Sequence, residues 1–146
     1  MIRHLKRIQL ARETNAPYGA GSFTPGNILI IGEQASDPST APEQLPFCDD
    51  VGCSGWLNNL LEAENIPEES LFWVNAKNND GTLIKLKELT KVLIPSMIFA
   101  LGKTAEKLCI AEGVNYKSFQ HPQYHKRFKS KQQYVLISQL KETCSC

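Results

Sequence analysis

The sequence predicts an α/β fold, a three-layer α/β/α sandwich around a central, mostly parallel four-stranded sheet. Apolar, β-branched runs alternate along the chain with segments of helical periodicity, which is the order of strands and helices in a parallel sheet covered on both faces. The composition agrees, because a chain of 146 residues with 42% hydrophobic and 21% charged residues can bury one continuous core. We therefore expect a single domain over residues 1–146.

The N-terminal third is predicted to contain one helix, one strand and a long loop. Residues 1–11 carry four apolar side chains at near-helical spacing, which predicts an amphipathic helix packed on the domain. Residues 27–31 form a continuous apolar run that is typical of a buried parallel strand. Residues 32–50 contain three prolines and no periodicity, and long loops of this kind are often functional. The four apolar residues of the helix are Ile2, Leu5, Ile8 and Leu10.

The rest of the chain continues the alternation. Ser54 can cap a helix, and Leu83, Leu86, Leu89 and Val92 recur at spacings of three, as on one face of another helix. The last apolar stretch, residues 133–141, is compatible with a helix or a strand, and we favour a helix. The predicted helices cover residues 54–64, 82–92, 104–112 and 133–141, and the predicted strands residues 71–74, 96–101 and 115–119.

Functional side chains are expected where strands end. Glu33 follows the strand that ends at Gly32, Asn75 follows the strand over residues 71–74, and His121 precedes a proline far along the chain. Open α/β proteins bind ligands at the carboxyl edge of their strands. A carboxylate and an imidazole brought to that edge indicate catalysis.

A basic segment is the candidate nucleic-acid surface. Five basic residues lie between Lys117 and Lys131 without an acidic residue, and aromatic side chains are interleaved with them. The formal net charge is only +1, so a nucleic acid must be met by such a local surface. The alternative is a solvated helix end.

The cysteines indicate a cytoplasmic protein without a disulfide framework. Their number is odd, five, and no signal peptide or long apolar span accompanies them, so we expect no membrane association. The C-terminal pair, Cys144 and Cys146, is too closely spaced for the usual metal-binding knuckle, and we expect it to be unstructured. No metal site is predicted.

Six short segments occur in a fixed order between about Thr14 and Leu140. In this order the chain resembles the uracil-DNA glycosylase superfamily, most closely its branch of small bacterial and archaeal enzymes that usually carry an iron–sulfur cluster. Each segment matches one motif of that branch, although no single match is specific. The segments are Gly32-Glu33, Pro46-Phe47, Gly52 to Leu61, Phe72 to Lys77, Ile98 to Ala105 and His121-Pro122.

The resemblance implies hydrolysis of the N-glycosidic bond of uracil, or a related modified pyrimidine, in DNA. Such a reaction develops positive charge on the sugar and negative charge on the departing base. Glu33 is assigned to the attacking water and the sugar cation, and His121 to a hydrogen bond with the pyrimidine O2. Phe47 is expected to stack on the flipped base, and Asn75, together with Gln34, to read its edge. The residues expected to contact the DNA backbone are Lys103, Tyr124, His125, Lys126, Arg127 and Lys129.

Two departures from the branch qualify this hypothesis. The segment from Thr14 to Ser22 has no cysteine, so we expect neither the iron–sulfur cluster nor another cofactor. The branch's Gly-Glu-Ala-Pro-Gly loop is Gly32-Glu33-Gln34-Ala35-Ser36 here, which indicates a pocket reshaped for another base or a weakened activity.

Simpler interpretations stay open for each residue. Glu33 can cap the following element, Asn75 can make a turn, Phe47 can belong to the core and His121 can be a hydrogen-bonded structural histidine. At the level of function, the leading hypothesis is a monomeric hydrolase that acts on single- or double-stranded DNA. The alternatives are a catalytically silent nucleic-acid-binding module of the same fold and an enzyme of viral DNA base modification.

Overall fold

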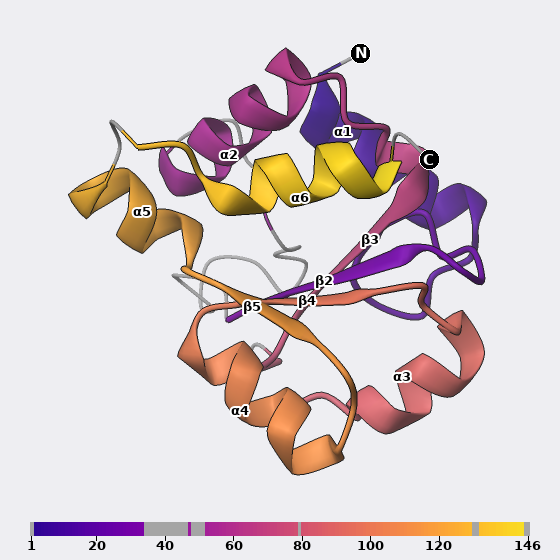
Figure 1. The fold of residues 1–146 in the computed structure, drawn as a ribbon. Coiled ribbons are helices and arrows are strands. Elements are labelled where there is room, and N and C mark those ends of the chain that lie inside the picture. The colour runs from indigo at the N-terminus through magenta and orange to yellow at the C-terminus, as the bar shows by residue number, and fades with distance from the viewer. Residues whose placement is uncertain (1, 34–46, 48–51, 79, 130–131, 145–146) are drawn as a thin grey trace.

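A five-stranded mixed sheet forms the centre of the computed structural model (Figure 1). The structure describes residues 2–33, 47, 52–78, 80–129 and 132–144. The strand order is β1-β3-β2-β4-β5, in which the last four are parallel and β1 runs antiparallel to β3. The strands are β1 (Ala20–Gly21), β2 (Ile28–Gly32), β3 (Leu71–Asn75), β4 (Ile98–Leu101) and β5 (Lys117–Phe119).

The α/β class and the four parallel strands are confirmed, whereas the count of four strands is wrong. The fifth strand, β1, contains only two residues and lies in a segment rich in glycine and turn formers. No apolar alternation in the sequence therefore predicts it. It pairs with Phe72 and Trp73 of β3. A Cβ atom at Gly21 would lie 2.6 Å from the Leu71 carbonyl oxygen, so this close approach requires glycine.

Helices cover both faces of the sheet, as Figure 1 shows. α2 (Gly52–Ala63) and α6 (Val135–Cys144) lie on one face, and α3 (Leu86–Leu93) and α4 (Lys103–Glu112) on the other. Successive residues of β2 alternate between the two cores: Leu29 and Ile31 face α3 and α4, whereas Ile28 and Ile30 face α2 and α6. α6 confirms the helix that was predicted over residues 133–141.

The N-terminal helix, α1 (Arg3–Glu13), forms where predicted but buries a different face. Arg3 and Arg7 are buried, whereas Ile2 and Leu5 are about half exposed. The reason is a buried carboxylate, Glu68, in the short 3-10 helix η1 (Glu68–Ser70), which pairs with both arginines. Apolar spacing therefore located the helix and misplaced its inner face.

The third predicted helix begins four residues later than expected. Leu83 makes an isolated bridge with Lys77, and the Ile84 amide donates to the Ala76 carbonyl, so this stretch is extended. The buried face of α3 is formed by Leu86, Leu89 and Leu93, which have true helical spacing.

A helix that was not predicted, α5 (Pro122–Phe128), follows β5. His121 is its N-cap and Pro122 occupies the first turn, where proline is well tolerated. Among the described residues no helix has the length and apolarity needed to cross a membrane.

Candidate active site

Four of the side chains selected from the sequence converge at one end of the parallel strands. Glu33 directly follows β2, Asn75 is the last residue of β3, and His121 lies two residues beyond β5. Gly32 and Asn75 are register partners, so the ends of β2 and β3 are aligned. Phe47 approaches the same edge from the chain that follows β2.

Gly32 brings Phe47 and Asn75 together. A Cβ atom at this position would lie 2.9 Å from Phe47 Cε2 and 3.0 Å from Asn75 Oδ1. The phenyl ring and the amide therefore both rest on the bare backbone of the strand end. Any larger residue would push one of them away.

Gly102 brings Glu33 and His121 together in the same way. It follows β4 with φ +96°, and a Cβ atom there would lie 3.1 Å from Glu33 Oε1 and 3.2 Å from His121 Cβ. The carboxylate and the imidazole thus share one small region. The ring centroids of Phe47 and His121 are 6.0 Å apart, which joins the two pairs into one site.

Backbone hydrogen bonds fix the segments that carry these groups. The Lys77 amide donates to the Glu33 carbonyl at 3.0 Å, and the Gly102 amide donates to the Phe119 carbonyl at 2.9 Å. The Tyr134 hydroxyl donates to the Gln120 carbonyl, directly before His121. The site is therefore supported by the sheet and by the residue that precedes α6.

The tautomer of His121 follows from its N-cap geometry. Its Nδ1 accepts a hydrogen bond from the Gln123 amide at 3.2 Å, so in the neutral ring the proton is on Nε2. Burial lowers the pKa of His121 below its ordinary value of 6.5, and the nearby Glu33 carboxylate partly opposes this shift. At neutral pH the group is a neutral imidazole whose Nε2–H is a donor.

Phe47 has an unusual backbone conformation. Its φ is +53°, in the left-handed region that residues other than glycine seldom adopt. The ring packs edge-on against Trp73 of β3, with centroids 5.6 Å apart, and is half-buried. Its carbonyl oxygen accepts hydrogen bonds from Arg7 and Asn58, two residues that the sequence analysis did not select.

The remaining predicted contact residues have different environments. Lys103, Tyr124, Lys126 and Arg127 are exposed, and Lys129 is partly exposed. Tyr124 and Phe128 pack against each other on the outer face of α5, with centroids 5.0 Å apart. Gln34 lies outside the described residues.

His125 does not belong to the exposed surface. It is 4% exposed, its ring packs against Trp56 and Tyr134, and its Nε2 is hydrogen bonded to the Gln132 carbonyl. Trp56 belongs to α2, so His125 lies on the side of α5 that faces α2. His125 therefore supports α5 from inside and is removed from the set of phosphate contacts.

Two of the described thiols, those of Cys53 and Cys109, offer little to a metal or a substrate. Burial raises the pKa of both Cys53 and Cys109 to about 11, so they are protonated at neutral pH. Within the described ranges, no three His, Cys, Asp or Glu side chains are grouped as a metal site would require.

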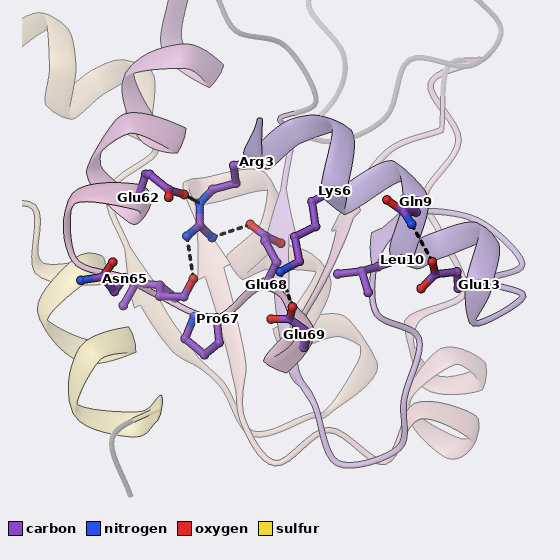
Figure 2. Close-up of a pocket in the computed structure, with 11 residues that line it drawn as sticks. Arg3, Lys6, Gln9, Leu10, Glu13, Glu62, Asn65, Pro67, Glu68 and Glu69 are labelled. Carbon is purple, nitrogen blue, oxygen red and sulfur yellow. Dashed lines mark hydrogen bonds and ion pairs between the residues drawn. The ribbon is translucent and has the colours of Figure 1, made fainter. Parts of the chain in front are cut away.

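A polar groove of about 750 Å³ lies elsewhere, between α1 and the connection from α2 to β3 (Figure 2). Most of its charged side chains pair with one another: Arg3 with Glu62 and Glu68, and Lys6 with Glu69. None of the predicted catalytic, base-binding or DNA-contact residues lines it. The site at the strand ends combines a carboxylate, an imidazole and an aromatic ring. It is therefore a better candidate for a catalytic site than the groove.

No model of a known protein family matches the chain, and no curated protein has a significantly similar sequence.

Proposed function

We propose that the chain is a DNA glycosylase-like hydrolase that cleaves the N-glycosidic bond of uracil, or a related modified pyrimidine, after flipping the base out of the DNA. One observation carries the proposal. Glu33, Phe47, Asn75 and His121 lie around the C-terminal ends of β2, β3 and β5, in contact with two glycines that leave room for them. The resemblance in motif order to the uracil-DNA glycosylase superfamily supports the same reaction.

The groups supply what each end of the breaking bond needs. Water adds to the sugar C1′ while the electron pair of the C–N bond leaves with the pyrimidine. The Glu33 carboxylate orients the water, accepts its proton and stabilises the positive charge that develops on the sugar. The neutral His121 donates its Nε2–H to the pyrimidine O2, where negative charge collects, and solvent later protonates the released base.

Base selection is assigned to Phe47 and Asn75. A flat ring can stack on the phenyl face of Phe47, and each such contact contributes about 1–3 kcal/mol. The Asn75 amide both donates and accepts, so it can match the carbonyl and N–H groups of a pyrimidine edge. A flipped base is required because the glycosidic carbon is shielded within a stacked duplex.

Helix α5 is the proposed contact with the DNA strand. It begins at His121 and presents exposed basic and aromatic side chains next to the site. Lys126 and Arg127 can neutralise phosphates, and Tyr124 and Phe128 can stack on unpaired bases.

The test is a cleavage assay on oligonucleotides that carry one uracil, single- and double-stranded, with alkali-labile abasic sites as the product. We expect Glu33→Gln to lower the rate about 10²–10⁴-fold, the usual contribution of a general base. We expect His121→Ala to lower it about 10²–10³-fold, the usual contribution of one oxyanion donor. Both variants should keep DNA binding, and Glu88→Gln, an exposed carboxylate on α3, should keep full activity.

Other outcomes overturn the proposal. Binding without an abasic product from the unmodified protein, on uracil and on several modified pyrimidines, would leave a base-binding module without hydrolase activity. Neither binding nor cleavage on any of these substrates would remove nucleic acid as the partner.

A further inference from the structure

The carbonyl of Phe47 is held by two buried side chains from distant parts of the chain. Arg7 of α1 donates from Nη1 at 2.7 Å, and Asn58 of α2 donates from Nδ2 at 3.0 Å. Arg7 also donates from Nη2 to Asn58 Oδ1 at 2.8 Å. The two donors are therefore locked to each other as well as to the backbone of Phe47.

A buried carboxylate fixes the arginine. Arg7 is fully buried and Glu68 is 2% exposed at its side chain, and Arg7 Nε and Nη2 both donate to that carboxylate. The guanidinium lies over the Trp73 ring at 4.1 Å, and the Trp73 indole donates to Glu68 Oε2 at 3.2 Å. Charge-assisted hydrogen bonds of this kind are stronger and more directional than neutral ones.

Phe47, the residue that this network holds, has an unfavourable backbone conformation. A left-handed φ in a residue with a bulky side chain persists only where the surroundings impose it, and such residues concentrate at functional sites. Here the carbonyl is fixed on one side, and on the other the ring is directed toward Gly32 and His121. The direction of the ring therefore depends on where the carbonyl is held.

We propose that Arg7 and Asn58 are positioning residues that hold Phe47 in the orientation in which its ring forms the stacking wall of the base pocket. Arg7 is fully buried and acts through the Phe47 carbonyl, so it is a positioning residue that does not touch the base. The part of this inference that concerns base binding rests on the proposed function. The part that concerns the orientation of Phe47 does not.

Arg3 provides a matched control. It is four residues from Arg7 on the same helix, is also buried and pairs with the same carboxylate, Glu68. Its other hydrogen bonds go to Glu62 and to the carbonyls of Leu61 and Ile66. Arg3→Met thus removes a buried charge from the same cluster without removing a hydrogen bond to Phe47.

The orientation is measured by fluorine NMR on protein labelled with 4-fluorophenylalanine. The chain has six phenylalanines, and the Phe47 signal is the one absent from Phe47→Leu. We expect Arg7→Met and Asn58→Ala to shift or broaden this signal, and Arg3→Met to leave it in place. Asn58→Ala removes a donor to Phe47 and an acceptor from Arg7 but no charge, so it keeps the test valid if Arg7→Met does not fold. An unchanged Phe47 signal in either folded variant overturns the proposal.

Base binding is measured in a Glu33→Gln background, in which turnover is slow. We expect Arg7→Met or Asn58→Ala to weaken binding of a uracil-containing oligonucleotide at least about tenfold, equivalent to about 1.4 kcal/mol. Binding of the same oligonucleotide with a tetrahydrofuran abasic site should not change, since it has no base to stack. Equal losses on both oligonucleotides would overturn the positioning role. If the parent protein binds neither, the proposed function fails, and the NMR result still decides the role of Arg7 and Asn58.

Discussion

His121 is the residue whose chemistry is most directly measurable. Its partly buried ring should titrate below 6.5, and Glu33 is the group that opposes this shift. We therefore expect Glu33→Gln to lower the pKa of His121 further, because the neutral amide no longer favours the imidazolium. NMR titration of the three histidines measures this, with His121→Gln assigning the signal. A pKa at or above 6.5, or one that Glu33→Gln does not lower, would contradict the close approach of Glu33 and His121 at Gly102.

Gly32 is predicted to be intolerant of a methyl group. In Gly32→Ala the new Cβ meets Phe47 Cε2 at 2.9 Å, and overpacking of this kind costs about 1–3 kcal/mol of unfolding free energy. Urea unfolding measures the loss. In a Phe47→Ala background the same change should cost clearly less, since the ring that it meets is gone. Equal costs in both backgrounds would mean that Phe47 does not rest on Gly32.

Single site residues could be predicted from the sequence where the order of strands alone determines their position. Glu33 and Asn75 end neighbouring parallel strands, and such ends meet at one edge whatever the details of packing. Arg7 and Asn58 could not be selected in this way, because their contact with Phe47 spans 40 and 11 residues and depends on tertiary packing. A weak signal existed in Arg3 and Arg7, which are four apart and so share one face of a helix.

Among the elements, α5 was missed and yet carries the proposed DNA contact. Seven residues with Pro122 at the start and no apolar stripe do not produce a helical periodicity. β1 was missed for the analogous reason, since two residues cannot alternate. Long periodic elements such as α2 and α4 were located to within about two residues, because packing against the sheet imposes their spacing on the sequence.

The basic side chains of α5 predict a salt dependence of DNA binding. Removing one phosphate contact from single-stranded DNA should reduce the slope of log K against log salt by about 0.7. We expect this of Lys126→Ala and Arg127→Ala, measured by fluorescence anisotropy with a labelled oligonucleotide. Lys91→Ala, on α3 at the opposite face of the sheet, should leave the slope unchanged (Figure 1). Equal slopes for all three variants would place the DNA on another surface.

The aromatic pair on α5 acts through stacking and has a different signature. Tyr124→Ala and Phe128→Ala should each weaken single-stranded binding by about 1–3 kcal/mol while leaving the salt slope in place. Both side chains are exposed, at 48% and 64%, so their removal should not affect unfolding in urea. Val135→Ala, an exposed apolar residue at the start of α6, is the control. A loss of stability instead of affinity would show that the pair supports the fold.

For the whole molecule, the placement of α1 depends on one buried carboxylate. Glu68 accepts hydrogen bonds from Arg3, Arg7 and the Trp73 indole, and thereby joins α1 to β3 and, through Arg7, to Phe47. The sequence suggested an apolar contact for this helix, and the burial of its arginines shows that ion pairing decides which face packs inward. The N-terminal helix is thus part of the support of the candidate site.

This arrangement predicts a large difference between two adjacent glutamates. Glu68→Ala leaves two buried guanidinium groups without their carboxylate, and breaking a buried pair of this kind costs about 3–5 kcal/mol of unfolding free energy. Glu69→Ala removes a partly exposed ion pair with Lys6, for which we expect about 0.2–1 kcal/mol. Urea unfolding monitored by the fluorescence of Trp73 and Trp56 measures both. Similar losses for the two variants would mean that solvent reaches the cluster around Glu68. In that case Arg7 would be too weakly fixed to hold Phe47, so this stability measurement also bears on the base pocket.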